Sequence, residues 1–276
     1  MKSSISASLS LKTEAPVLII SPAGGSSYLS DDFPNAIFYP LNDLQEMNAL
    51  LDDLSSNMKE FRALHMIVAS GDEERLESAK KYYAEEFDYM YKLATKSEYP
   101  ISAIVVEEIS IISSWIQDEV ESSLDIVSAG EDKTRRGSEW NVLRRKIMEF
   151  YSKILKLPCM TILCTGSRLP SEQQGSNQIT PNLCVGAAQR DLIQTIGNLF
   201  YCYKNDKNEY LVRISGDKKI MTKDKILSPF SNQKCPDEIN VTNRPEYLWE
   251  LLNDMKTQDI KDRQSNTMNK SEKKTK

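Results

Sequence analysis

The feature that most constrains the fold is PVLIISPAGGSSYLS at residues 16–30, where a short apolar run ends in a turn rich in glycine and serine. Four consecutive apolar residues, Val17–Ile20, are typical of a strand that is covered on both faces of a sheet. The glycines and serines that follow are typical of a loop. The sequence therefore predicts a buried strand with a loop at its carboxyl end.

A loop at this place binds phosphate when it follows the pattern G-x-x-x-x-G-K-[ST], whose backbone N–H groups and lysine contact phosphates and whose hydroxyl binds Mg²⁺. Here the pattern is incomplete, because Gly25, Ser26 and Ser27 replace Gly-Lys-Ser in a loop one residue short, and neither register holds a lysine. The candidate phosphate-binding residues are Ser21, Gly24, Gly25, Ser26 and Ser27. The alternative is an ordinary strand followed by a turn that binds nothing.

Length and charge predict one large domain with tails. The 276 residues, 40% of them hydrophobic, suffice for a substantial core. Residues 256–276 hold seven Lys or Arg and three Asp or Glu, a net charge of +4. Because the net charge of the whole chain is −5, residues 1–255 carry a net charge of −9. We expect a flexible N-terminal arm at 1–15, a domain at 16–255 and a basic disordered tail at 256–276.

Cysteine and histidine usage excludes several classes of site. The five cysteines include no C-x-x-C pair, so neither a zinc ribbon nor a disulfide framework is expected. His65 is the only histidine, and its apolar surroundings favour a core role over catalysis. No stretch approaches 18 apolar residues, so we expect a cytoplasmic protein without a membrane segment.

Strands and helices alternate over the first 165 residues, which predicts an α/β fold with a mainly parallel sheet flanked by helices. A late antiparallel hairpin completes an outline of the RecA type. A mobile loop is expected at 169–182. The expected strands are 17–20, 36–39, 65–69, 103–106, 160–164, 199–204 and 209–215, and the expected helices are 43–57, 71–93, 109–128, 138–157, 184–197 and 245–255.

Polar residues follow two of the expected strands directly. Glu107 and Glu108 come after the apolar run 103–106, and Thr165 begins the polar stretch after 160–164. Ligands of open parallel sheets bind at the carboxyl ends of the strands. The two carboxylates are therefore candidate functional residues.

Several stretches in order resemble the RecA-like AAA ATPases encoded by tailed phages, a P-loop family of single-strand-annealing recombination partners and DNA-binding ATPases. The resemblance covers about residues 15–252. SPAGGSS followed by YLSDDFPNAIF resembles the family's phosphate loop and second strand, and AIVVEEIS its Walker B strand. The other matching stretches are SEWNVLRRKIMEFYSKILKLPCMTILCTGS, TPNLCVGAAQRDLIQTIGNLFYCY and TKDK at 222–225.

The resemblance implies a RecA-like P-loop NTPase fold that binds ATP and Mg²⁺. It implies that Ser27 takes part in binding Mg²⁺, that Glu107 holds the metal through water and that Glu108 orients the attacking water. Lys223 and Lys225 are the candidates to replace the missing lysine.

The sequence departs from the family pattern at the residues that bind phosphate and metal. The loop lacks its lysine, and Pro40-Leu41-Asn42 carries no carboxylate where the family has D-x-E. Hydrolysis is therefore expected to be absent or very slow. Two alternatives remain: a pseudo-ATPase acting as a structural or interaction protein, oligomeric or part of a phage particle, and a single-stranded DNA-binding protein that uses the basic tail and Arg144, Arg145 and Lys146.

Overall fold

The computed structural model describes the chain in two compact units. The sheet unit comprises residues 6–166 and 183–189, and the hairpin unit residues 1–5, 167–182 and 190–276, where the sequence predicts one domain over 16–255. The described residues are 2–22, 27–123, 136–169, 177–184, 186–223 and 235–272, with backbone only at 136–139, 186–187 and 262–272.

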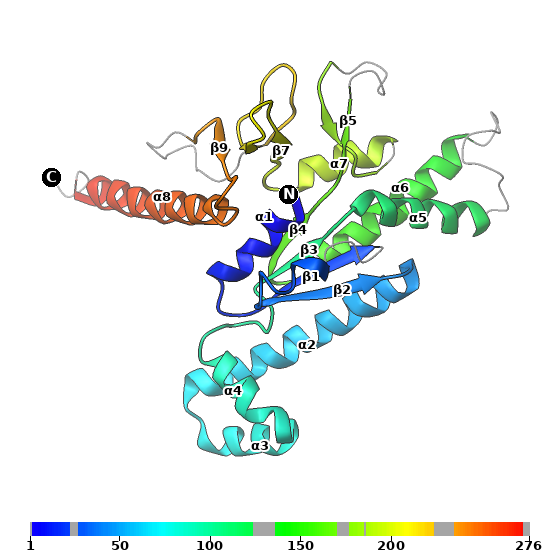
Figure 1. The fold of residues 1–276 in the computed structure, drawn as a ribbon. Coiled ribbons are helices and arrows are strands. Elements are labelled where there is room, and N and C mark those ends of the chain that lie inside the picture. Colours follow the sequence, from blue (N-terminus) through cyan, green and yellow to red (C-terminus); the bar gives the residue numbers. More distant parts are fainter. Residues whose placement is uncertain are drawn as a thin grey trace. The chain divides into compact units, whose positions relative to one another are not determined.

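A four-stranded parallel sheet in the order β2-β1-β3-β4 forms the centre of the sheet unit (Figure 1). Val17 pairs with Ala36 on one side and with Ala103 on the other, and Ala103 pairs in turn with Met160. The predicted parallel neighbours are thus confirmed, with their carboxyl ends at one edge. The strands are β1 Val17–Pro22, β2 Ala36–Leu41, β3 Ala103–Val106 and β4 Met160–Leu163.

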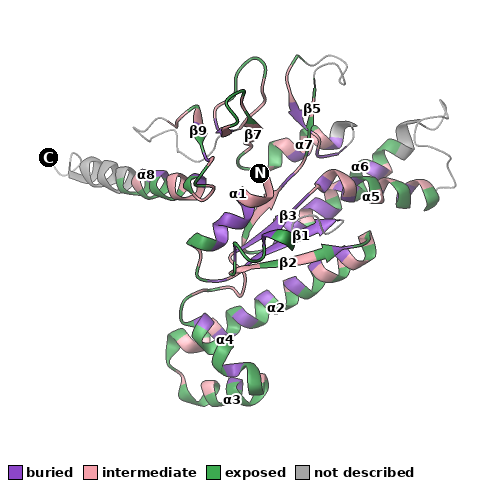
Figure 2. Ribbon diagram, in the orientation of Figure 1, coloured by how far each residue is buried: buried purple, intermediate pink, exposed green. Residues whose placement is uncertain are grey.

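Burial follows the position of each strand in the sheet. Every residue of the inner strands β1 and β3 is buried, whereas the outer strands β2 and β4 are partly exposed (Figure 2). This explains the continuous apolar runs of the inner strands. Pro40, which cannot donate a backbone hydrogen bond, lies in β2 at the edge of the sheet, where a proline is tolerated.

The N-terminal segment expected as a flexible arm forms a helix, α1 (Lys2–Ser8), and a 3₁₀ helix, η1 (Leu9–Lys12), in which Leu9 and Ser10 are buried. The other helical elements of the sheet unit are η2 Ser27–Leu29, α2 Leu44–Ser70, α3 Glu73–Tyr83, η3 Ala84–Glu86, α4 Phe87–Ala94, α5 Ile109–Ser123 and α6 Arg136–Leu155.

Helix α2 is far longer than the sequence predicts. It continues to Ser70, so the predicted strand at 65–69 is wrong, and the apolar run LHMIVAS forms the last turns of the helix. Met58, Phe61 and Leu64 extend the buried stripe beyond the expected end at residue 57. Packing on one face thus decides between helix and strand for a run whose pattern is ambiguous.

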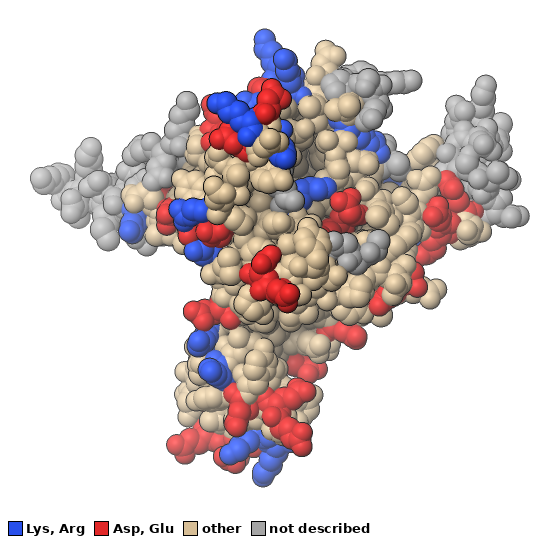
Figure 3. All heavy atoms as spheres, in the orientation of Figure 1, with Lys and Arg blue, Asp and Glu red and all other residues tan. Residues whose placement is uncertain are grey.

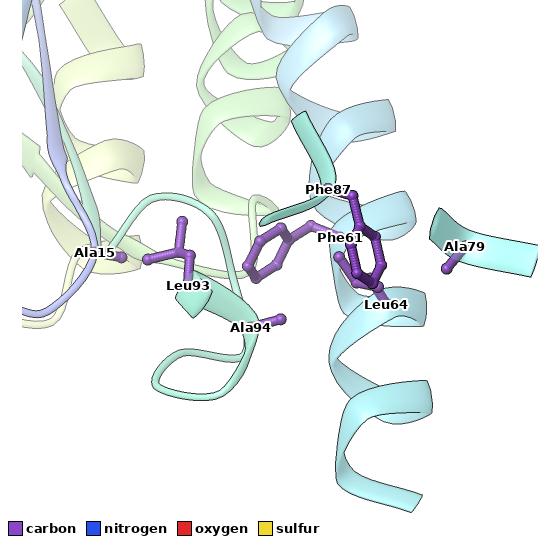
Figure 4. Packing of buried hydrophobic residues seen from close by; sticks show 7 residues of the cluster. All are labelled: Ala15, Phe61, Leu64, Ala79, Phe87, Leu93 and Ala94. Carbon is purple, nitrogen blue, oxygen red and sulfur yellow. The ribbon is translucent and has the colours of Figure 1, made fainter. Parts of the chain in front are cut away.

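Helix α2 has 27 residues and is therefore about 40 Å long, which is longer than the strands of the sheet. Its C-terminal half packs against α3 and α4 (Figure 4). Phe61 and Leu64 belong to one buried cluster with Phe87 and Leu93. The helix predicted over 71–93 is divided at Ala84, whose φ is 47°.

The predicted hairpin is confirmed in the hairpin unit by β7 (Tyr201–Lys204) and β8 (Tyr210–Arg213), which pair antiparallel. A third strand, β9 (Glu238–Asn240), joins β8 and was not predicted. Ile5, Val212 and Leu248 belong to the core beneath this sheet. The remaining elements are β5 Ser167–Arg168, β6 Thr180–Pro181, α7 Gly186–Thr195, which is divided between the two units, and α8 Tyr247–Glu272, which runs past its predicted end at 255 into the expected tail.

Gly71 ends α2 in a left-handed conformation with φ of 67°, and its N–H donates to the Val68 carbonyl. We predict that Gly71→Ala lowers the free energy of unfolding by about 1 kcal/mol, because a Cβ is unfavourable at this φ. Gly166→Ala is the matched control, since a Cβ there also meets open space but Gly166 has no positive φ. Equal urea midpoints for the two variants would contradict this account.

Candidate functional site

The order of the strands places a candidate site at the carboxyl ends of β1 and β3. From β1 the chain adds β2 on one side, and then places β3 and β4 on the other side. This is the order found in doubly wound sheets of the flavodoxin type, whose ligands bind where the direction of winding switches. The switch lies between β1 and β3, where the sequence predicts phosphate-binding and acidic residues.

Backbone hydrogen bonds hold Glu107 beside the end of β1. Its N–H donates to the Ile20 carbonyl at 2.9 Å, and Ile20 pairs with Val106 in the parallel register. Ser21 and Glu107 therefore occupy the next position on each strand. The structure thus brings these two predicted site residues together at the switch point.

The Glu107 side chain is buried to an extent that is rare for an acid. Its exposed fraction is 5%, and its Oε1 atom has no hydrogen-bond partner among the described residues. Burial of a carboxylate oxygen without a partner is unfavourable, and such oxygens in folded proteins are usually paired with a donor, a water or a cation. Glu107 Oε1 is therefore a buried acidic oxygen at the switch point that the described part of the chain leaves without a donor.

Glu108 adopts a strained backbone conformation. Its φ is 45°, in the left-handed region that a glutamate seldom occupies. This residue turns the chain from β3 into α5, and its carbonyl accepts from the Ile111 N–H at 2.8 Å. Strain of this kind costs on the order of 1–3 kcal/mol and is concentrated at functional sites.

The structure describes only part of the predicted phosphate-binding loop. Gly24, Gly25 and Ser26 lie outside the described residues, and Ser27 is exposed at the start of η2. Phosphate loops gain stabilisation from the N-terminus of the helix that follows them. The three residues of η2 form a single 3₁₀ turn before the chain returns to β2, so a long helix does not supply this stabilisation.

A carboxylate that sequence reasoning missed lies at the end of β2. The Glu46 side chain accepts hydrogen bonds from the Asn42 N–H at 2.9 Å and from the Tyr39 hydroxyl at 3.0 Å. These bonds lower the pKa of Glu46, the Asn42 bond having the larger effect. The sequence signal that could have indicated this role of Glu46 is the capping pattern that begins at Asp43, whose side chain accepts a hydrogen bond from the Glu46 N–H. Glu46 is thus engaged in capping α2.

Lys223, a predicted substitute for the loop lysine, caps a helix in the hairpin unit. Its Nζ donates to the carbonyls of Ile193, Gln194 and Ile196 at 2.6–2.8 Å, at the carboxyl end of α7. An ammonium has three donors, and a cation is favourable at this end of a helix. Lys225 lies outside the described residues.

The basic residues of α6 are exposed and in part paired with acids. Arg145 lies 3.7 Å from Glu149, and Lys146 lies 3.8 Å from Glu119. Such surface pairs contribute about 0–1 kcal/mol each. They are typical of a solvated helix face, and they leave less free positive charge for DNA than the sequence suggests.

Over the ranges described above, the structure holds no group of three or more His, Cys, Asp or Glu side chains arranged for a metal ion. Mg²⁺ does not need such a group, because it is commonly held by one or two carboxylates together with substrate phosphates and water. None of the helices in the described part of the chain is long and apolar enough to cross a membrane.

We predict that Glu107→Met raises the free energy of unfolding by about 1–3 kcal/mol in the absence of ligand, because the variant removes a buried oxygen for which the described residues provide no hydrogen-bond partner. Glu119→Met is the control, since Glu119 is an exposed acid in α5. Chemical denaturation measures both. A loss of stability in Glu107→Met would show that the carboxylate has a structural partner.

Lys223→Met should destabilise the hairpin unit by about 1–3 kcal/mol, because helix carbonyls lose a charged donor. Lys219→Met removes an exposed lysine nearby in the sequence and should change stability by less than about 0.5 kcal/mol. Thermal unfolding followed by circular dichroism compares the two. A neutral Lys223→Met would contradict the capping role.

No protein-family model matches the chain, and no curated protein matches its sequence. The candidate site is therefore argued from its residues and geometry.

Proposed function

We propose that the sheet unit binds a nucleotide together with Mg²⁺ and hydrolyses it very slowly or not at all. The observation that carries the proposal is the buried Glu107 carboxylate beside Ser21 at the β1/β3 switch point, whose Oε1 has no hydrogen-bond partner among the residues that the structure describes. We further propose that the chain is a divergent RecA-like P-loop protein of phage DNA recombination or replication. That part rests on the sequence resemblance alone.

A nucleotide with its metal fits this edge better than a free metal ion does. One buried carboxylate is too few ligands for a site built from protein alone, but it suffices when phosphates supply further oxygens. Glu107 would hold the ion directly or through water, and the hydroxyl of Ser27 follows the loop at the place where P-loop proteins have their metal-binding hydroxyl. When bound, the ion would neutralise phosphate charge.

Slow hydrolysis follows from what the chain lacks. Phosphoryl transfer depends mainly on positioning and on neutralising charge as it develops. The loop has no lysine, η2 is a single turn, and the Glu46 carboxylate, which accepts from the Asn42 N–H just past the end of β2, is used in capping. The three donors of Lys223 contact helix carbonyls.

Calorimetric titration with ATP, with and without Mg²⁺, tests the proposal. We expect Mg²⁺-dependent binding that Glu107→Gln weakens at least about tenfold, with Glu119→Gln unchanged, since loss of one charged partner of a metal costs about 1.4 kcal/mol or more. Phosphate release should be negligible with or without single-stranded DNA, and Ser26→Lys should not restore it, because a misplacement of about 1 Å can cost a hundredfold in rate.

Two outcomes would overturn the proposal. Absence of ATP binding in the presence of Mg²⁺ would remove the nucleotide site. Robust turnover by the unaltered protein that disappears in Glu108→Gln would return the chain to the active ATPases.

A second candidate function is that of an interaction protein without a nucleotide. It is favoured by Tyr82 and Tyr89 of α3 and α4, whose exposed fractions are 68% and 62%. Large exposed aromatic side chains are enriched at protein interfaces. This candidate predicts self-association, measured by light scattering, that Tyr89→Ser reduces, together with no response to ATP.

A further inference from the structure

We propose that the outer face of the β7-β8-β9 sheet binds single-stranded nucleic acid by stacking bases on Tyr201 and Tyr203. This inference goes beyond the nucleotide site, because its residues belong to the hairpin unit and its argument uses none of the site residues at the switch point.

The strand register separates the two faces of this sheet. Cys202 and Val212 pair across the strands and belong to the core side, packed with Ile239. Tyr201 and Tyr203 alternate with Cys202 and therefore point to the opposite face. The two tyrosines thus lie on the face that is turned away from the core.

The two rings form an ordered pair. Their centroids are 5.7 Å apart with an interplanar angle of 24°, a stacked arrangement, and both residues are half-buried. The Tyr203 hydroxyl donates to the Glu238 carboxylate of β9, across the sheet. This bond raises the pKa of Tyr203 and fixes its ring. Little side-chain freedom remains to be lost when a base stacks on the pair.

Exposed lysines lie at both ends of this hairpin. Lys207 is at the β7–β8 turn, and Lys218 and Lys219 follow the other end of β8, whereas Lys204 alternates with Tyr203 and its Nζ lies 5.4 Å from the centre of the Tyr210 ring. Residues 199–223 hold six Lys or Arg and three Asp or Glu, a net charge of +3 in a chain of net charge −5. Figure 3 shows blue side chains gathered around this region, with red ones among them.

Several of the acids here are already engaged. Asp217 accepts from Arg213 at 2.9 Å and from two backbone N–H groups, which lower its pKa, and Glu209 accepts from Asn205 at 2.8 Å. The two acids keep their negative charge, which these contacts offset in part, and Lys207, Lys218 and Lys219 are the exposed cations that a phosphate backbone would meet.

This combination favours an unpaired strand over a duplex. Base faces are hidden in a duplex, whereas in a single strand every base has a face that can stack on an aromatic ring. Lys207 at one end of the hairpin, and Lys218 and Lys219 at the other, suit a backbone whose phosphates continue on either side of the stacked bases. DNA and RNA share this chemistry, so the test includes both.

The experiment measures fluorescence anisotropy of labelled oligothymidylate and oligouridylate with the full chain at several salt concentrations. We expect Tyr201→Leu, which keeps apolar bulk but has no ring, to weaken binding about five- to hundredfold. Tyr203→Phe keeps its ring and should retain most of the affinity. Charge reversal of Lys218 and Lys219 should weaken binding and flatten its salt dependence by roughly two counterions.

Matched controls in the sheet unit are Tyr91→Leu and Lys92→Glu, both exposed. Equal losses in these controls, or an oligonucleotide affinity that Tyr201→Leu does not change, would overturn the proposal. Self-association through this face without oligonucleotide binding would also overturn it. ATP titration of Tyr201→Leu keeps the two proposals apart, because its nucleotide binding should be unaltered.

Discussion

The structure of the sheet unit depends on one strand that pairs on both sides. β1 hydrogen-bonds to β2 along one side and to β3 along the other, and all its residues are buried. The winding reverses at this strand, which is the position where ligands of doubly wound sheets bind. The same pairing that stabilises the centre of the sheet therefore places Ser21 and Glu107 next to each other.

Much of this sheet could be predicted because its signals are local. The inner strands are uninterrupted apolar runs, and Glu107 follows one of them directly, so its place at the strand's end could be read from the sequence. The end of α2 could not be predicted from the sequence, because LHMIVAS fits a buried strand as well as a buried helix face. Its helical state depends on Phe61 and Leu64 packing against α3 and α4.

Features that join distant residues escaped prediction for a different reason. The side of β1 on which β3 pairs, the addition of β9 to the hairpin and the bonds from Lys223 to α7 all involve residues far apart in the sequence. The pattern around each residue does not specify its partner. Lys223 illustrates this, since a lysine in a basic run is compatible both with binding phosphate and with capping a helix.

The energetics of the switch point are compatible with the proposed binding without turnover. An unpaired buried carboxylate oxygen costs about 1–3 kcal/mol, and the strained Glu108 costs a similar amount. A ligand present at a hundred times its dissociation constant stabilises the folded state by about 2.7 kcal/mol, which is enough to offset either cost. Binding needs only that Glu107 gain a cation, whereas catalysis also needs positive charge placed on the transferring phosphate. Under the proposed function, the buried acid would meet the first requirement, and the absence of a lysine from the loop sequence would leave the second unmet.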